Sequence, residues 1–527
     1  MTIKKISLLY NTVKYLKPIQ IRYRVYYALR KKLRNLTGFA YPLSMPSDSE
    51  SLKLLGGIAA PKSYEAENRF TFLNLTHRFE NRIDWNFKKY GKLWTYNLNY
   101  FDFLNQDGMD IKDGLRLIRD YIESLSYIED GLEPFPVSLR GINWIKFLSR
   151  HKIDDPNIDS SLYAQYCILM DNIEYHLLGN HLLENGFSLL YGAYYFKDEK
   201  FYEKAKEILE KELQEQILSD GAHFELSPMY HQLMLYRVLE CINLMKNNRF
   251  KEEDILLALF NEKAAVMAGW MKKMTFSNGD IPLLNDSALG IAPTSFQLLQ
   301  YASTLNLLPK KMELSDSGYR IWKNEKYEIV VDIGKIGPDY IPGHAHSDTF
   351  TFLLYKNGEP LIVDTGISTY EPNERRQKER GTAAHNTVMV EGLEQSEVWG
   401  AFRVADRAYV YETEESENTI TARHDAYKKR LDATHERKFV FNEKSIRISD
   451  KIISKKSYRG EFFIHFHPNI KLSVDKNRIF CNNAQITVKG ADITLSDYMY
   501  APEFNNLKNA KMVKLSFKNS MEIEIAL

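Results

Sequence analysis

Apolar residues recur at helical spacing between about residues 93 and 307. Asp220-Gly221, Asn278-Gly279 and Asn185-Gly186 are expected to mark turns or helix ends in this region. Successive helical hairpins of this length predict a toroid of helix pairs with an open concave face. The segments with the clearest helical period are residues 114–125, 160–178, 201–218, 229–245 and 253–271.

The pattern changes near residue 310, after which short β-branched and aromatic runs follow one another. Lys356-Asn357-Gly358-Glu359 has the composition of a tight hairpin turn between two of these runs. An antiparallel β-sandwich is the simplest fold for this half. Expected strands are residues 327–333, 349–355, 360–364, 387–390, 437–441, 445–450, 460–466, 486–489 and 513–517. We therefore expect an amino-terminal extension (1–60), a helical toroid domain (61–312) and a β-sandwich domain (313–527).

The amino-terminal extension is strongly basic, with ten Lys and Arg residues and no acidic residue from Met1 to Ser47. It lacks the apolar core and cleavage site of a secretory signal, so the sequence leaves the protein's location open. No later stretch is long and apolar enough to span a bilayer. Two interpretations stay open for the extension. It could lie on an anionic membrane surface or an acidic polymer, or it could be a solvated basic helix packed on the protein.

Composition narrows the possible partners further. The chain has 44% apolar and 26% charged residues, which is typical of a globular protein. Its net charge of +1 gives no overall attraction to nucleic acid, and we expect none as a partner. Cys167, Cys241 and Cys481 form no CxxC pair and do not suggest a disulfide framework. A metal site would have to use histidines and carboxylates.

One candidate site lies in the predicted sandwich, in Gly343-His344-Ala345-His346-Ser347-Asp348. Two histidines at i and i+2 on an extended segment point the same way. Asp364 and His385 follow within forty residues, so two histidines and one aspartate could form a zinc site. The alternative is a buried network in which these side chains hydrogen-bond one another.

Two more candidate sites lie in the helical half. Asn180, His181 and Glu184 share one helix face, just before the expected stop at Asn185-Gly186. Ser227-Pro228 begins another helix and places Tyr230 in its first turn. Capping, solvation or packing between helices would explain any one of these residues alone.

Five motifs together resemble the heparinase II/III-like family of polysaccharide lyases, whose relatives include alginate lyases and a uronyl epimerase. They occur in the family's order and cover about residues 90 to 400. The resemblance implies an incomplete (α/α) toroid followed by an antiparallel β-sandwich. The motifs are Leu93-Trp94-Thr95-Tyr96-Asn97-Leu98-Asn99-Tyr100-Phe101-Asp102, Asn180-His181-Leu182-Leu183-Glu184-Asn185, Ser227-Pro228-Met229-Tyr230, Gly343-His344-Ala345-His346-Ser347-Asp348 and Ala384-His385-Asn386-Thr387.

The resemblance also implies roles for individual residues. Asn180 and His181 resemble the pair that neutralises a uronate carboxylate, whereas Tyr230 and His344 resemble the catalytic tyrosine and histidine. His346, Asp364 and His385 resemble the ligands of a structural zinc, and no organic cofactor is expected. Tyr370 resembles a second tyrosine of related lyases, and Glu184 an acidic residue near the carboxylate-binding group. Arg140, Trp144 and Arg237 are further candidates for substrate contact.

The expected reaction is β-elimination at a uronic acid of an acidic polysaccharide. We expect Glu184 to hold the ring of His181, and Tyr230 to need a lowered pKa if it acts as both base and acid. Three alternatives stay open. The first is a C5-epimerase on the same scaffold, and the second is a glycoside hydrolase using two of Glu225, Asp280 and Asp286. The third is a non-catalytic protein of polysaccharide assembly.

Overall fold

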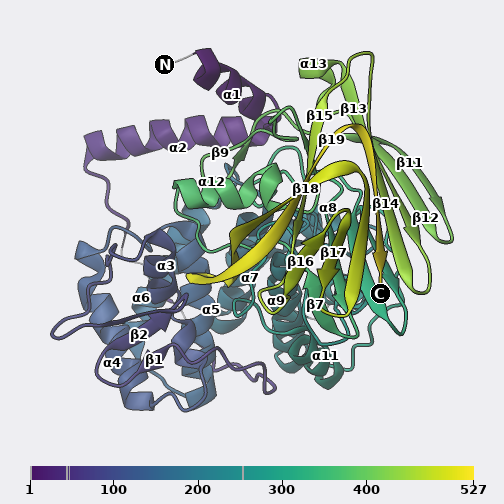
Figure 1. Cartoon of the computed structure of the whole chain (residues 1–527). Helices are drawn as coiled ribbons and strands as arrows, with labels where there is room; N and C mark the ends of the chain where they lie inside the picture. Colours follow the sequence, from purple (N-terminus) through teal and green to yellow (C-terminus); the bar gives the residue numbers. More distant parts are fainter. Residues whose placement is uncertain (1–2, 43–44, 47, 252–254) are drawn as a thin grey trace.

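The computed structural model describes residues 3–42, 45–46, 48–251 and 255–527. The chain forms a helical half followed by a β half, as the sequence predicts, and Figure 1 shows the two halves with a pair of amino-terminal helices beside them. The last long helix ends at Thr304 and the first strand of the β half begins at Tyr319. The boundary expected near residue 312 lies between them.

Within the described residues, nine α-helices build the helical half, and helices that contact one another are adjacent or two apart along the chain. Each of the segments with the clearest period lies largely in a helix, although residues 253 and 254 of the last one lie outside the described residues. The helices are α3 (Lys92–Tyr100), α4 (Ile111–Ser124), α5 (Pro134–His151), α6 (Pro156–Asp171), α7 (Gly179–Phe196), α8 (Glu199–Gln216), α9 (Pro228–Asn247), α10 (Ile255–Met274) and α11 (Ser295–Thr304).

The helical half differs from the sequence expectation in three places. A small sheet of β1 (Tyr64–Glu65), β2 (Arg69–Phe72) and β3 (Leu75–Arg78) precedes the helices. The helix expected over residues 160–178 ends at Asp171. Asn185-Gly186 is not a stop, because α7 continues to Phe196. Gly186 serves packing instead: a Cβ there would lie 3.0 Å from side-chain atoms of Ile208 and Leu209 on α8.

The β half is an antiparallel sandwich of a four-stranded and a ten-stranded sheet. The expected hairpin turn is present, with positive φ at Asn357 and Gly358. The smaller sheet contains β4 (Tyr319–Lys323), β5 (Tyr327–Asp332), β6 (Phe352–Lys356) and β7 (Glu359–Ile362). The larger contains β8 (Val388–Val390), β11 (Val410–Ser416), β12 (Thr419–His424), β13 (Ala433–Phe441), β14 (Ser445–Ser454), β15 (Arg459–His465), β16 (Leu472–Asp475), β17 (Arg478–Cys481), β18 (Ala484–Glu503) and β19 (Asn506–Ala526).

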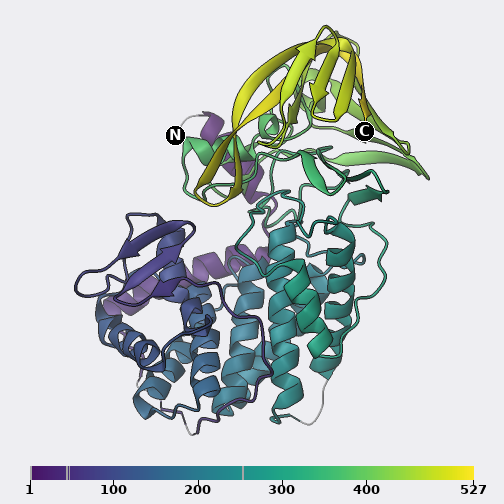
Figure 2. The same cartoon turned by 60° about the horizontal axis from the view of Figure 1, so that its bottom comes forward.

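The four-stranded sheet lies between the larger sheet and the helices, and it joins the two halves. Every residue of β5 is buried, because both faces of this strand are covered. Ile329 and Val331 belong to the core between the sheets, whereas Val330 belongs to the helical core. Figure 2 shows the β half lying across one end of the helices. Loops from both halves therefore meet at this end.

Two helices of the amino-terminal extension, α1 (Ile3–Val13) and α2 (Pro18–Thr37), rest on the outside of both halves. The buried Gln20 side chain of α2 donates hydrogen bonds to the carbonyl oxygens of Leu177 and Tyr340, one from each half. On α1, Thr12 accepts a hydrogen bond from the indole of Trp399 at 3.0 Å. Among the described residues, no helix is long and apolar enough to cross a membrane.

Candidate active site

The candidate site lies where helix starts from one half meet loops from the other. Asn180 and Tyr230 lie in the first turns of α7 and α9, and Ser227 caps α9 by accepting a hydrogen bond from the Tyr230 amide. His344 lies in the loop between β5 and β6, and Tyr370 lies between β7 and the short helix α12 (Glu374–Arg380). His181, Tyr230, His344 and Tyr370 are partly exposed, so their side chains are accessible to a ligand.

The imidazole of His344 joins the two halves. Its Nε2 lies 3.3 Å from the amide nitrogen Nδ2 of Asn180 and 3.4 Å from a carboxylate oxygen of Glu225. Asn180 also donates to Glu225 from its backbone nitrogen, at 3.0 Å, and from its side chain, at 3.1 Å. The predicted proximity of Asn180 and His344, which are 164 positions apart in sequence, is therefore confirmed.

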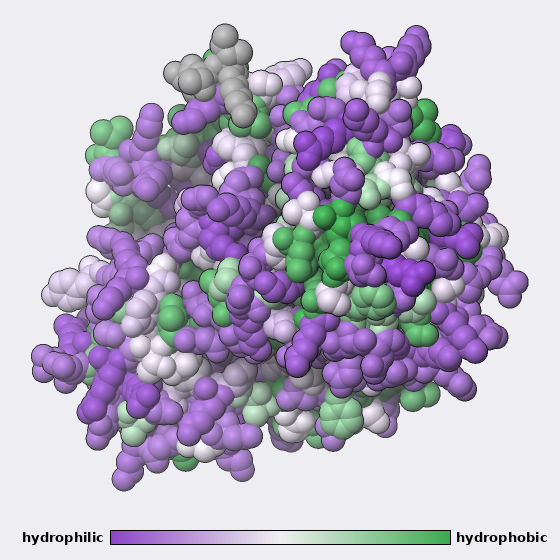
Figure 3. All heavy atoms as spheres, viewed as in Figure 1, coloured by the Kyte–Doolittle hydropathy of each residue, from purple (hydrophilic) through white to green (hydrophobic). Residues whose placement is uncertain are grey.

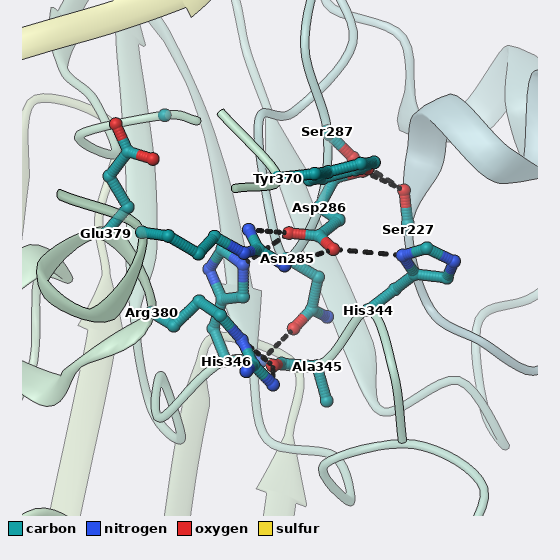
Figure 4. Close-up of polar contacts among 12 residues, drawn as sticks. Ser227, Asn285, Asp286, Ser287, His344, Ala345, His346, Tyr370, Glu379 and Arg380 are labelled. Atoms are coloured by element: carbon teal, nitrogen blue, oxygen red, sulfur yellow. Dashed lines mark hydrogen bonds and ion pairs between the residues drawn. The ribbon is translucent and has the colours of Figure 1, made fainter. Parts of the chain in front are cut away.

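A buried ion pair supports the other side of His344. The Nδ1 of His344 lies 2.9 Å from Asp286 (Figure 4). The carboxylate of Asp286 also contacts Nε2 of His346 at 2.8 Å and both terminal nitrogens of Arg376. Burial would raise the pKa of Asp286, but Arg376 and the two histidines hold it well below its usual range. The anionic form of Asp286 is therefore stabilised, and it favours the His344 tautomer with a proton on Nδ1.

Two tyrosines flank His344. The ring of Tyr230 stacks on its imidazole, with centroids 3.8 Å apart, and the two phenol oxygens of Tyr230 and Tyr370 are 3.4 Å apart. Burial raises the pKa of Tyr230 above its ordinary value, although the hydrogen bond with Tyr370 opposes this. The lowered pKa that a dual base and acid would need is not present in this structure. A neutral phenol at this position is a proton donor.

His181 has a different carboxylate partner from the one expected. Its Nδ1 lies 3.1 Å from Glu174, not from Glu184. Burial lowers the pKa of His181, but the charge and hydrogen bond of Glu174 outweigh this and raise it. The other oxygen of Glu174 accepts a hydrogen bond from Asn185. Asn185, expected to end the helix, thus helps to position the carboxylate beside His181.

Glu184 is held instead by Arg237. The Nε of Arg237 lies 3.2 Å from both carboxylate oxygens, and both residues are buried. The prediction that Glu184 holds the His181 ring is wrong, because this ion pair already engages its charge. Contact of Glu184 or Arg237 with substrate stays a prediction.

Arg140 and Trp144 do not contact the site, so their predicted role in substrate binding is wrong. Both side chains are fully buried in α5. Arg140 donates hydrogen bonds to Gln165 and to backbone carbonyls of the helical half. Trp144 packs edge-on against Phe101, with ring centroids 5.4 Å apart. Both residues stabilise the helical core.

The residues predicted as zinc ligands are close together but are not arranged as a complete ligand set. The rings of His346 and His385 lie 5.3 Å apart, and buried Nδ1 of His346 and Nε2 of His385 have no hydrogen-bond partner. Asp364 contacts the opposite nitrogen of His385, at 2.7 Å. Within the described ranges, no three His, Cys, Asp or Glu side chains are placed to hold one ion. Zinc at this position therefore stays a prediction, which metal analysis of the purified protein tests.

Two family models together match most of the chain. The Heparinase II/III N-terminus model matches residues 158–315, and the Heparinase II/III-like, C-terminal model matches residues 307–526. The chain belongs to the heparinase II/III-like family. The two matched regions contain every residue described above in the contact network around His344.

Curated relatives of this heparinase II/III-like protein include two heparin-sulfate lyases. That of Pedobacter heparinus is 25% identical over an alignment of 358 residues that covers 60% of this chain and 51% of the relative. That of Bacteroides stercoris is 26% identical over an alignment of 261 residues that covers 42% of this chain and 37% of the relative. The matches thus span about half or less of each relative's length.

Solved structures of other proteins have a fold similar to that of this chain. A crystal structure of heparinase III has a TM-score of 0.68 at 16% identity, covering 97% of this chain and 92% of the other. A chondroitin AC lyase of Streptomyces coelicolor reaches 0.50 at 9% identity, covering 83% and 74%. The predicted fold, a helical region followed by a large antiparallel β region, is confirmed.

Several residues of the site were not assigned to it from the sequence. Glu174 and Arg376 lie outside the five family motifs, and the sequence indicates Glu225 and Asp286 only as carboxylates of a hydrolase. The Asn285-Asp286-Ser287 segment gave one signal, because three small polar residues follow a buried apolar run. The pairing of Asp286 with Arg376, ninety positions later, had no local signal.

Proposed function

We propose that this heparinase II/III-like protein cleaves a uronic-acid-containing polysaccharide by β-elimination, giving a 4,5-unsaturated uronate. The observation that carries the proposal is the meeting of Asn180, Tyr230 and His344 from the two halves in one partly exposed cluster. β-Elimination needs charge neutralisation at the carboxylate, a base at C5 and an acid at the leaving O4. This cluster offers one group for each task.

Asn180 and His181 would bind the uronate carboxylate. One N–H of the Asn180 amide is committed to Glu225, and the other faces His344 and can turn to a substrate oxygen. The Nδ1 of His181 is engaged by Glu174, which leaves Nε2 to donate. A raised pKa keeps His181 charged over a wider pH range, so the ring can stabilise the enolate-like dianion that forms when C5 loses its proton.

His344 would be the base. Asp286 accepts the Nδ1 proton, so Nε2 carries the lone pair. Nε2 also faces the amide of Asn180, which places the base beside the carboxylate-binding group. Proton transfer to Nε2 gives an imidazolium between the carboxylates of Asp286 and Glu225, and both stabilise its charge.

Tyr230 would protonate the departing O4. Its neutral phenol stacks beside His344, and the hydroxyl of Tyr370 can either accept from it or donate to it. Burial favours the neutral form, which suits an acid. The C5 proton therefore goes to His344, the C4–O4 bond breaks as the C4–C5 double bond forms, and the Tyr230 proton goes to O4.

The geometry favours this reaction over glycoside hydrolysis. A hydrolase needs two carboxyl groups free to act on the glycosidic bond. Asp286 is fully buried and paired with Arg376, and Glu225 accepts two hydrogen bonds from Asn180. Neither carboxylate is therefore free to act as the acid, base or nucleophile of a hydrolase.

The test is a panel of uronic-acid polymers: heparan sulfate, hyaluronan, chondroitin, alginate and acidic bacterial exopolysaccharides. Each is incubated with the protein while unsaturated uronate is followed by ultraviolet absorbance and chain length by gel filtration. We expect absorbance to rise as chain length falls for at least one polymer. Deuterium incorporation at C5 without chain cleavage would instead identify an epimerase. Binding without either change would identify the non-catalytic alternative.

A further inference from the structure

The amino-terminal helix α2 is amphipathic in an unusual orientation, with its apolar side facing solvent. Val25, Leu29 and Leu33 follow one another at four-residue spacing and are 54%, 62% and 61% exposed. Ile21 and Leu36 extend this row to both ends of the helix. Side chains four residues apart lie along one face of a helix, so these five residues form a continuous apolar strip.

Polar contacts, together with packing of Ile19 and Tyr23, attach the opposite side of α2 to the protein. Gln20 hydrogen-bonds to two backbone carbonyls, and Tyr27 donates to the carbonyl of Ile173 at 2.6 Å. Arg30 and Arg34 both pair with Asp171 on α6, at 2.9 and 2.6 Å. These contacts fix the rotation of the helix and hold the strip away from the core.

The neighbouring helix α1 repeats the arrangement. Ile6, Leu9, Tyr10 and Val13 share one face and are 41–69% exposed, whereas Thr12 bonds to the protein. Figure 3 shows hydrophobic side chains among hydrophilic ones at the upper left, over the carboxyl-terminal part of α2. We call the outward faces of α1 and α2 together the extension face.

The charged side chains of α1 and α2 are all positive. Arg22 and Lys32 lie within or beside the apolar strip, and Lys5, Lys14 and Lys31 are also exposed. In the described part of the chain, none of these five forms an ion pair with a carboxylate. The extension contains no acidic residue before Asp48 that could neutralise them.

We propose that the extension face lies on the surface of an anionic lipid membrane. Exposed apolar side chains interleaved with unpaired cations are typical of helices that lie in the membrane interface. A second copy of the chain fits less well, because a symmetric contact would bring two cationic faces together without counter-charges. Anionic headgroups would neutralise Arg22 and Lys32 while Val25, Leu29 and Leu33 enter the acyl boundary.

The experiment is vesicle flotation of the full-length protein with phosphatidylcholine vesicles that contain or lack phosphatidylglycerol. We expect binding to the anionic vesicles, with little binding to pure phosphatidylcholine and loss of binding at high salt. The Leu29→Ser/Leu33→Ser variant should bind at least about tenfold more weakly, because two apolar anchors are removed. The Arg22→Glu/Lys32→Glu variant should show a similar loss.

A matched control is Phe296→Ser/Leu308→Ser, which removes two residues that are 75% and 82% exposed elsewhere. This variant should float as the unchanged protein does. Circular dichroism and size-exclusion chromatography of each variant check that it is folded.

The proposal is overturned if the unchanged protein does not bind anionic vesicles, or if the control loses as much binding as the Leu29/Leu33 variant. A dimer that disappears in the Leu29/Leu33 variant, without vesicle binding, would assign the face to a second copy. Heparin binding without vesicle binding would assign it to an acidic polymer.

Discussion

The two halves of the molecule contribute to the site in different ways. The helical half places Asn180 and Tyr230 in the first turns of long helices, where the backbone and a capping serine fix their position. The β half supplies His344 and Tyr370 from loops, which have no such support of their own. Instead, the buried pair of Asp286 and Arg376 holds the loop histidine. Helices thus fix the backbone of the groups they carry, although Glu225 also holds the Asn180 side chain, whereas His344 depends on charged residues from distant parts of the chain.

Removing the carboxylate charge of Asp286, which holds His344 in its loop, should have the largest effect on activity and stability. Asp286→Asn leaves Arg376 buried without its counter-charge and lets His344 change tautomer. We expect turnover to fall by about 100-fold or more and the free energy of unfolding to fall by about 3–5 kcal/mol. Chemical denaturation and initial rates measure the two effects. Asp280→Asn, which lies outside this network, is the control and should retain turnover. Full turnover in Asp286→Asn would show that the loop histidine needs no such support.

A change on the helix side should alter pH dependence more than stability. Because Glu174 raises the pKa of His181, Glu174→Gln should lower it. In the proposed reaction His181 acts in its protonated form, so the alkaline limit of activity should lie at a lower pH in Glu174→Gln than in the unchanged protein. Beyond that point kcat/KM should fall roughly tenfold for each unit by which the pKa drops.

The pH profile of kcat/KM measures this shift. Glu207→Gln, which removes a surface carboxylate paired with Lys204, is the control and should leave the profile unchanged. If kcat/KM of Glu174→Gln falls at the same alkaline pH as in the unchanged protein, Glu174 does not control the protonation of His181.

The smallest effect on activity should come from the buried core of the helical half. Trp144→Phe should lower the free energy of unfolding by about 0.5–3 kcal/mol, because it removes packing against Phe101. KM and turnover of the folded variant should stay within about twofold of the unchanged protein. Thermal denaturation and steady-state kinetics test this. A raised KM with unchanged stability would return Trp144 to the substrate-binding residues.

The sequence predicts the features that depend on short stretches of residues. Helical period and turn residues predicted the two halves, and Ser227-Pro228 predicted that Tyr230 lies in the first turn of its helix. The hairpin at Asn357-Gly358 was also predicted, because few residues adopt positive φ readily. The resemblance supplied the grouping of Asn180, Tyr230 and His344, which no local pattern could give.

Other features depend on contacts between distant segments, and predictions from neighbouring residues were wrong for them. Asn185-Gly186 looks like a helix end, but the glycine allows α7 to pack closely on α8. Glu184 is one turn from His181 on the same helix, yet it pairs with Arg237. Glu174, from the loop between α6 and α7, contacts His181 instead. Arg140 and Trp144 have side chains suited to sugar binding, but burial decides their role. Burial and pairing arise only in the folded chain.

The central claim is that a histidine from the β half and a tyrosine from the helical half act on the same sugar, one as base and the other as acid. Reactions in deuterated water with Tyr230→Phe and with His344→Gln test it most directly. Mass spectrometry follows C5 deuteration, and ultraviolet absorbance follows elimination. We predict that Tyr230→Phe still exchanges the C5 hydrogen but forms little unsaturated product, whereas His344→Gln does neither. Exchange that survives in His344→Gln and is lost in Tyr230→Phe would contradict the assignment.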